Sequence, residues 1–423
     1  MHEALEKFSQ SSEVHDREDF YTFLDKIYQA KGKLLLVLGG KSVGKSLVLG
    51  DFKKKLGDDF NYLPLLADGR GFSGSPLSHG ILKGYKDMFK IGSGRLALTE
   101  ENALKGLRFL AQSILQTFNL GQTLLERLQG KDVGDLTDDD KSFVSKSIDS
   151  LIDSAIKSGE ISGADAIESF VGVAEQMGKR PVLIVDEANK VLGLGDGPNG
   201  KSQTLDQIVQ LTKQQKRLNV VMASSEYAYP YLLEDNGLNL NDISSILFAG
   251  EIPPKSMWEL LVTKKDKNSN KPLIGMGENL AQILIASYGG HVLRLQQVLS
   301  LLQSETDLSA RVGLNPIGEN ITEVMTRFPS KGLALLRQMA KNGFAPVKRT
   351  RDPVVEIIVR SNIGGIVSIE NAKTVGLPRT IWKDNVHSAL IPTSESARNL
   401  IAIEVLYFEQ ELERERLERE RLE

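Results

Sequence analysis

The feature that most constrains this chain is a short apolar segment that ends in a glycine-rich loop. Residues 34–38 are leucine and valine only, and the loop Gly39-Gly40-Lys41-Ser42-Val43-Gly44-Lys45-Ser46 follows directly. A short, saturated apolar run stopped by glycine is typical of a strand buried on both faces of a parallel sheet. Apolar residues from Leu47 onward then begin a helical pattern. The sequence therefore predicts a strand, a tight loop and a helix in succession.

The loop matches the phosphate-binding pattern G-x-x-x-x-G-K-[ST] in the structural context that this pattern requires. Glycines let the backbone curl so that successive N–H groups point at phosphate oxygens, and the positive end of the following helix adds to the attraction. We expect Lys45 to reach the β- and γ-phosphates and Ser46 to offer its hydroxyl to Mg²⁺. The predicted nucleotide-binding positions are Gly39, Gly40, Lys41, Ser42, Val43, Gly44, Lys45, Ser46 and Leu47.

The rest of the chain predicts an α/β fold. Helical patterns separate most of the short apolar runs, and this alternation indicates crossover units and a doubly wound parallel sheet. A long helical insertion is expected at about residues 75–178, where Thr137 and Asp140 form a capping-box-like helix start. Four runs resemble the first one: residues 62–67, 182–185, 220–223 and 246–249.

Two of these strands end in residues suited to phosphate chemistry. Asp186 and Glu187 close the third run, and the carboxyl ends of parallel strands share one edge of a sheet. We expect Asp186 to orient Mg²⁺ through its water shell and Glu187 to polarise the attacking water. The fourth run ends in Ser224 and Ser225, and Ser225 or Ser224 could sense the γ-phosphate or hold the water, with Ser225 as the preferred candidate. A simple turn or cap is the competing interpretation for this pair.

Composition excludes several other chemistries. The chain has no cysteine, so a thiol nucleophile, a cysteine-ligated metal and a disulfide framework are excluded. Its net charge is −3, so a nucleic-acid site requires a local basic patch. The five histidines are scattered without metal-ligand spacing. No apolar run approaches the roughly 18 residues of a membrane span, and the N-terminus lacks signal-peptide features, so we expect an intracellular protein.

The order of these motifs resembles P-loop ATPases of the AAA+/STAND group, particularly the archaeal-type branch. The resemblance covers about residues 15–305, although the insertion is longer than this family leads one to expect. The ATPase regions of Crinkler-type and retrotransposon-hot-spot effectors are also similar. The matching features are Arg17-Glu18, the phosphate loop, Asp186-Glu187, Ser224-Ser225, and Phe248–Pro254 ahead of a helical segment with Gly289-Gly290-His291.

The resemblance implies a P-loop NTPase parallel sheet of the additional-strand kind, with ATP and Mg²⁺ as cofactors. It also implies a helical lid in which Arg294 contacts the γ-phosphate, an ordinary surface arginine being the alternative, and a small C-terminal winged-helix-like domain. The expected division is an N-terminal helical segment at 1–30, the ATPase core at 31–255, the lid at 256–325, the winged-helix-like domain at 326–407 and a charged helical tail at 408–423.

The function expected on these grounds is that of an ATP hydrolase acting as a conformational or oligomerisation switch, with self-association in the ATP state. Lys45, Glu187 and Ser225 are the predicted catalytic residues, and Ser46 and Asp186 the predicted metal ligands. The alternatives are a non-hydrolysing nucleotide-binding scaffold and a DNA-associated ATPase. DNA would contact the basic cluster at residues 348–351, for which a solvated charge run is the competing interpretation.

The tail that begins at Glu411 is of low complexity. Its leucines recur every fifth residue and step about 140° around a helix, so they form no continuous seam. Opposite charges four residues apart, such as Glu415 and Arg419, favour a solvated single helix. A segment that binds a protein partner is the alternative.

Overall fold

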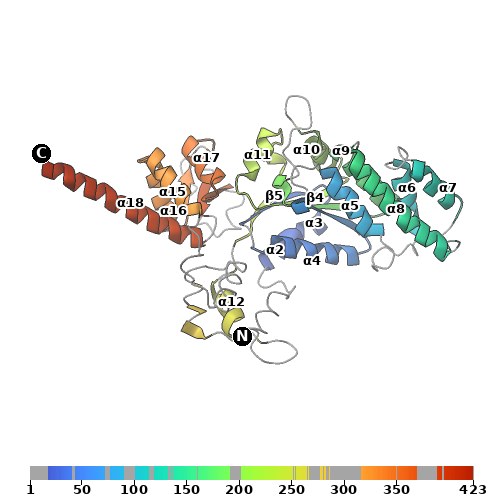
Figure 1. Ribbon diagram of the computed structural model, residues 1–423, viewed down its shortest axis with the longest axis horizontal. Coiled ribbons are helices and arrows are strands. Elements are labelled where there is room, and N and C mark those ends of the chain that lie inside the picture. Colours follow the sequence, from blue (N-terminus) through green and yellow to red (C-terminus); the bar gives the residue numbers. More distant parts are fainter. Residues whose placement is uncertain are drawn as a thin grey trace.

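The structure of this protein is a computed structural model in which the described helices and strands form a larger α/β part and a smaller C-terminal part (Figure 1). The described residues are 18–40, 43–71, 77–89, 101–113, 119–131, 137–159, 161–190, 202–250, 254–263, 316–348, 350–368, 388–392 and 395–422, with a few isolated positions.

A five-stranded parallel sheet forms the centre of the larger part, with the order β2-β3-β4-β1-β5. This is the P-loop NTPase sheet that the sequence predicts, and β1 lies between β4 and β5 with all its residues buried. Each strand falls within two residues of one predicted run. The strands are β1 (Leu34–Leu38), β2 (Tyr62–Asp68), β3 (Arg180–Asp186), β4 (Asn219–Ser224) and β5 (Ser245–Phe248).

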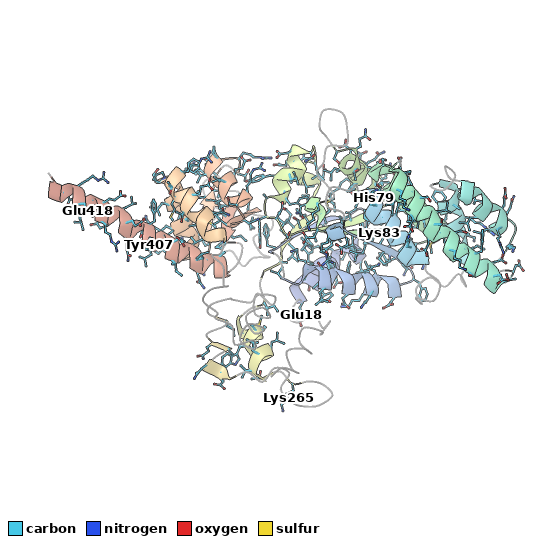
Figure 2. All side chains as sticks on the ribbon, viewed as in Figure 1. Glu18, His79, Lys83, Lys265, Tyr407 and Glu418 are labelled. Atoms are coloured by element: carbon cyan, nitrogen blue, oxygen red, sulfur yellow. The ribbon has the colours of Figure 1, made fainter. Side chains whose placement is uncertain are left out.

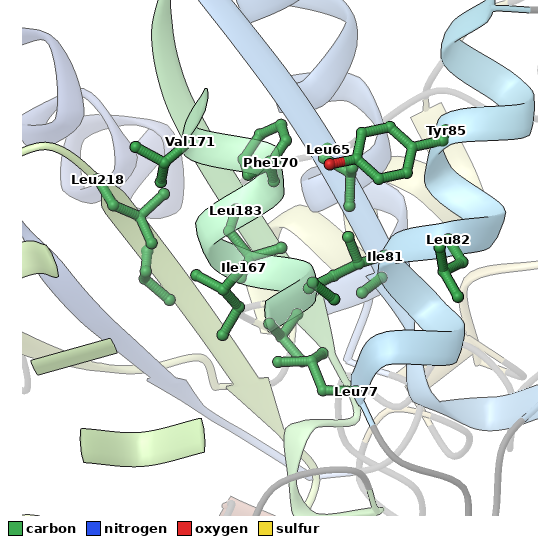
Figure 3. Close-up of a cluster of buried hydrophobic side chains, with 14 of the residues drawn as sticks. Leu65, Leu77, Ile81, Leu82, Tyr85, Ile167, Phe170, Val171, Leu183 and Leu218 are labelled. Atoms are coloured by element: carbon green, nitrogen blue, oxygen red, sulfur yellow. The ribbon is translucent and has the colours of Figure 1, made fainter. Parts of the chain in front are cut away.

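Successive residues of β1 point to opposite faces, and each face has its own apolar core. Leu35 and Val37 lie in a cluster with the first helices of the chain, whereas Leu34, Leu36 and Leu38 lie in the cluster that includes the inserted helices. On the first face lie α2 (Glu18–Leu24), α3 (Lys26–Gln29) and α4 (Lys45–Asp58). On the second face lie α5 (Leu77–Phe89), α9 (Gly163–Gln176) and α10 (Gln203–Val209), and Figure 3 shows how Ile81, Tyr85 and Phe170 meet there.

The insertion consists of helices, as predicted. α6 (Glu101–Ser113), α7 (Asn119–Leu128) and α8 (Asp138–Ser158) lie between α5 and α9 in the chain. Thr137 begins α8 with the expected capping box, in which the backbone N–H of Asp140 donates to Thr137 Oγ1 over 3.2 Å. Side-chain hydrogen bonds from Lys131, Arg127 and Thr137 hold the pKa of Asp140 well below its usual range.

The C-terminal part is a small helical domain with a three-stranded antiparallel sheet of order β6-β8-β7, as expected for the predicted winged-helix-like domain. A third apolar cluster forms its core. The strands are β6 (Ala345–Val347), β7 (Gly364–Ser368) and β8 (Ser388–Pro392), and the helices are α15 (Pro316–Arg327), α16 (Lys331–Asn342), α17 (Pro353–Arg360) and α18 (Glu395–Leu422).

Helix α18 runs without a break into the charged tail and projects away from its domain (Figure 1). Tyr407 and Glu418 mark the projecting part (Figure 2), and Glu415 pairs with Arg419 over 3.7 Å as predicted. None of the described helices is long and apolar enough to cross a membrane. The domain limits given above stay a prediction.

Of the predicted lid at 256–325, the structure describes the beginning, a few isolated positions and the part that overlaps α15. α12 (Pro254–Trp258) and the π-helix η8 (Glu259–Thr263) follow β5. The Gly289-Gly290-His291 turn and Arg294 lie outside the described residues.

The core between α9 and the sheet provides a test of this fold. Phe170 on α9 is fully buried, so Phe170→Ala should lower the free energy of unfolding by about 3–5 kcal/mol. Phe60 is the matched control, because 77% of it is exposed and Phe60→Ala should change stability by less than about 0.5 kcal/mol. Denaturant unfolding measures both, and equal losses would contradict the packing described here.

Candidate functional site

The carboxyl ends of the central strands meet at one edge of the sheet, as the sequence predicts. In the register of the sheet, Leu38 at the end of β1 is level with Ser224 at the end of β4. Asp68 at the end of β2 is likewise level with Asp186 at the end of β3. The loops that leave these strands therefore share a single edge, and the predicted site residues come from several of them.

The predicted phosphate loop leaves β1 and ends at α4. Gly44 is the N-cap of α4 and has φ = 87°, a left-handed conformation that favours glycine. Gly39 has no room for a side chain, since a Cβ there would lie 2.5 Å from the carbonyl oxygen of Ala249. Lys41 and Ser42 lie outside the described residues. The described part of the loop is thus fixed at both ends, against the exit of β5 and on the start of α4.

Lys45 is the first residue of α4, and its side chain turns back into the loop. Its ammonium group donates to the carbonyl oxygens of Gly39 over 2.8 Å and Gly40 over 2.9 Å. Only 5% of the residue is exposed. Leu47, in the same helix, is 40% exposed. The predicted phosphate loop therefore encloses the positive charge of Lys45.

Asp186 lies opposite the start of α4 and is almost completely buried. Burial raises the pKa of its carboxyl group above the usual value, although the nearby Ser46 hydroxyl and the charge of Arg70 act in the opposite direction. The Ser46 hydroxyl is close enough to this carboxylate to lower its pKa. The backbone N–H of Glu187 donates to Asp186 Oδ1 over 3.0 Å. The two predicted metal ligands, Ser46 and Asp186, are thus brought together.

Glu187 has a backbone conformation that is rare for a residue with a side chain. Its φ is 50°, and a strained backbone of this kind is often found at functional sites. The Ser225 hydroxyl donates to Glu187 Oε2 over 2.9 Å, so the third and fourth strands hold this carboxylate between them. Gly69 makes room for the turn, since a Cβ there would lie 2.6 Å from the Glu187 carbonyl oxygen.

Asn189 is a member of the site that sequence reasoning missed. It belongs to the short 3₁₀ turn η4 (Ala188–Lys190), and its amide donates to Glu226 Oε1 over 2.8 Å. The Ser224 hydroxyl donates to Asn189 Oδ1 over 3.1 Å. Ser224 and Ser225 therefore have different partners, although both follow the same strand. The feature of the sequence that could have indicated Asn189 is its polar side chain three positions after Asp186.

The second missed group is the pair formed by Asp68 and Arg70. Arg70 lies in the 3₁₀ turn η1 (Gly69–Gly71), and its Nη2 atom is 2.6 Å from Asp68 Oδ2. The same nitrogen is 3.7 Å from Asp186 Oδ2, so a guanidinium charge lies beside the buried carboxylate. Asp68 ends an apolar run just as Asp186 does, and this was the signal that the sequence offered.

No family model matches this sequence, and no curated protein matches it. Among solved structures, the chain is similar to the Walker-type ATPase PABY2304 of Pyrococcus abyssi at 15% identity, with 92% of this chain and 96% of that one covered and a TM-score of 0.44. It is also similar to Cdc6p of Pyrobaculum aerophilum, at 11% identity, 94% and 96% coverage and a TM-score of 0.35.

A further similar structure is the ORC2 protein of Aeropyrum pernix in ADPNP and ADP complexes, at 9% identity, 94% and 96% coverage and a TM-score of 0.36. The similarity to Crinkler-type and retrotransposon-hot-spot effectors stays a prediction. The chemistry available to the site follows from its own residues.

The buried carboxylate of Asp186 gives a testable dependence on pH. Because its pKa is raised in the folded protein, its charge destabilises the fold above that pKa, and the penalty disappears as the pH falls through it toward the ordinary value of 3.8. Asp186→Asn should therefore raise the melting temperature of the ligand-free protein at pH 7, and the gain should shrink as the pH falls.

Asp68→Asn is the matched control. Burial raises the pKa of Asp68, but the hydrogen bonds and charge of Arg70 bring it below its usual value overall. Its charge therefore stabilises the fold at pH 7, and Asp68→Asn should lower the melting temperature. Calorimetry over a pH series measures both variants, and a lower melting temperature for Asp186→Asn at pH 7 would contradict the assignment.

Proposed function

We propose that this protein binds ATP with Mg²⁺, hydrolyses it, and uses the nucleotide state to change the position of its C-terminal domain. The observation that carries the proposal is the placement of Ser46, in the first turn of α4, beside Asp186 at the end of β3, where its hydroxyl lowers the pKa of the Asp186 carboxyl group. A phosphate loop alone can hold a nucleotide, but hydrolysis also requires a place for the cation and a group that activates water.

The residues present fit a magnesium ion. Mg²⁺ is usually bound by one or two protein oxygens and by phosphate oxygens and water. The Ser46 hydroxyl and the Asp186 carboxylate are two such oxygens, and the buried carboxylate lacks a full counter-charge because Arg70 also pairs with Asp68. When bound, the ion neutralises charge on the β- and γ-phosphates.

Glu187 is the residue placed to act on water. Ser225 occupies its Oε2 atom, which leaves Oε1 as the acceptor for a proton from a water molecule. The left-handed backbone at Glu187 turns this side chain toward β4, whereas Asp186 remains directed at α4. The two neighbouring acids thus have separate tasks, which supports hydrolysis over a scaffold that only holds the nucleotide.

The switch part of the proposal is supported by a contact between domains. The backbone N–H of Tyr227, two residues after Ser225, donates to the side-chain oxygen of Asn362 over 3.0 Å. Its ring stacks on Phe248 with centroids 6.3 Å apart, and a Cβ at Gly365 would lie 2.7 Å from that ring. A shift of Ser225 with the nucleotide state is therefore passed to the C-terminal domain through adjacent residues.

A second contact reduces the case for DNA binding by the predicted basic cluster. Arg351 pairs with Glu234 over 2.8 Å and with Asp235 over 3.2 Å, at the end of α11 (Tyr229–Asp235). The Tyr231 hydroxyl in the same helix donates to the carbonyl oxygen of Thr350 over 2.6 Å. This part of the cluster is used to hold the two domains together.

Glu187→Gln tests the hydrolytic step. The variant should keep ATP binding and lose roughly 10²- to 10⁴-fold in turnover, because the amide cannot take a proton from water. Lys45→Ala should instead weaken Mg-ATP binding by roughly 2–5 kcal/mol, since a buried charge partner of the phosphates is removed. Calorimetry and phosphate-release assays separate the two effects. Normal turnover by Glu187→Gln would refute the role given to this residue.

Asn362→Gly tests the coupling between the domains. Asn362 has φ = 55°, which glycine adopts freely, so this substitution removes the acceptor for Tyr227 with little added strain. The unpaired N–H should cost about 1–3 kcal/mol of interface stability. With Glu187→Gln present to hold ATP, X-ray scattering should show an ATP-dependent change in the parent protein that is reduced in the Asn362→Gly variant.

Both proteins are compared at saturating ATP, because coupling is reciprocal and the loss of Asn362 can also change ATP affinity. An ATP-dependent change of equal size in both proteins would show that Asn362 does not couple the domains.

A further inference from the structure

The edge of the sheet opposite the phosphate loop carries a group of lysines, here called the lysine edge: Lys26, Lys31, Lys33, Lys213 and Lys216. The first three belong to α3 and to the turn that leads into β1. The other two belong to the π-helix η6 (Gln210–Gln214) and to the turn that precedes β4. The turns meet because the Lys33 backbone N–H donates to Asn219 Oδ1 over 2.8 Å, and the Val220 N–H donates to the Lys33 carbonyl oxygen over 2.7 Å.

Two of these ammonium groups lie against neighbouring serine hydroxyls. Lys26 Nζ donates to Ser245 Oγ over 3.0 Å, and Lys213 Nζ donates to Ser244 Oγ over 2.9 Å. Lys26 comes from the α2–α4 face of the sheet, and Lys213 follows α10 on the other face. The start of β5 is therefore flanked by a cation on each side.

No salt bridge neutralises the charge of the lysine edge within the described residues. None of its members forms an ion pair with a described carboxylate, whereas the neighbouring Arg217 pairs with Glu168 over 2.9 Å and with Glu175 over 2.8 Å. Burial and the charge of Lys33 lower the pKa of Lys26. The same two effects lower the pKa of Lys213, although Asp242 acts in the opposite direction. These ammonium groups therefore repel one another.

The backbone that holds the lysines has two left-handed residues, of which only Lys216 is strained. Gly32 has φ = 72° and Lys216 has φ = 54°, which is a rare value for a residue with a side chain. A Cβ at Gly32 would lie 2.1 Å from the Thr212 carbonyl oxygen and 3.0 Å from the Lys216 side chain. Left-handed residues and π-helical turns are both enriched at functional sites. The fold thus holds like charges together, and the left-handed conformation of Lys216 adds a conformational free-energy cost.

We propose that the lysine edge is a second phosphate site, which binds the phosphodiester backbone of a nucleic acid. Ammonium groups and serine hydroxyls are typical partners of backbone phosphates. Cations on both sides of β5 fit a chain of successive phosphates better than one isolated anion. The site differs from the predicted basic cluster, and it is independent of ATP hydrolysis.

The experiment measures the binding of a labelled oligonucleotide, single-stranded or duplex, to the full chain by fluorescence anisotropy over a series of salt concentrations, without nucleotide. The wild-type chain should bind with a clear salt dependence. Lys26→Gln, Lys33→Gln and Lys213→Gln combined should weaken binding roughly tenfold or more at low salt and reduce the slope of log K against log salt by about 2–3. The salt slope expected for each contacted phosphate differs between a duplex and a single strand. Comparing the two oligonucleotides therefore shows which form of nucleic acid the lysine edge binds.

The charge-matched control combines Lys54→Gln, Lys157→Gln and Lys341→Gln, three exposed lysines on other helices. It should bind like the wild type. The triple variant of the lysine edge should keep or raise the melting temperature, because it removes mutual repulsion, and should hydrolyse ATP at the wild-type rate.

Three results would overturn the proposal: no salt-dependent binding by the wild type, equal binding by the triple variant, or an equal loss in the control. ATP turnover is measured in parallel, so failure of this proposal is distinguishable from failure of the proposed ATPase activity.

Discussion

The approach of Ser46 to Asp186 is the interaction on which the rest of the site depends. It requires the exits of β1 and β3 to lie at one edge with β4 between them, as the strand order has it. The same order places Ser225, on the strand in between, beside Glu187. One arrangement of strands thus positions the phosphate loop, the buried acid and the group that would act on water.

Burial of the Asp186 carboxylate at this edge of the sheet destabilises the folded protein. Asp186 is almost fully enclosed, and its pKa is raised for that reason. Arg70 offsets part of the cost, but it is shared with Asp68. The cation proposed above to lie between Ser46 and Asp186 would complete the compensation.

The features predicted from the sequence are those fixed by local pattern. The strands predicted from the apolar runs and the Thr137 capping box each depend on a few consecutive residues, and the structure confirms them. Asn189, Arg70 and the contact between Tyr227 and Asn362 depend on which loops the fold brings together, and no local pattern signals that. The basic cluster was visible in the sequence, but the acids that pair with Arg351 lie more than a hundred residues earlier in the chain.

The length of β1 sets the distance between the edge of the sheet with the phosphate loop and the lysine edge. Five residues, at about 3.3 Å each, separate the phosphate loop from Lys33 by about 17 Å. That distance is about twice the screening length of roughly 8 Å in physiological salt. Two polyanionic ligands at opposite ends of the sheet would therefore neither compete nor repel strongly, and any communication between them would have to pass through rigid movement of the strands.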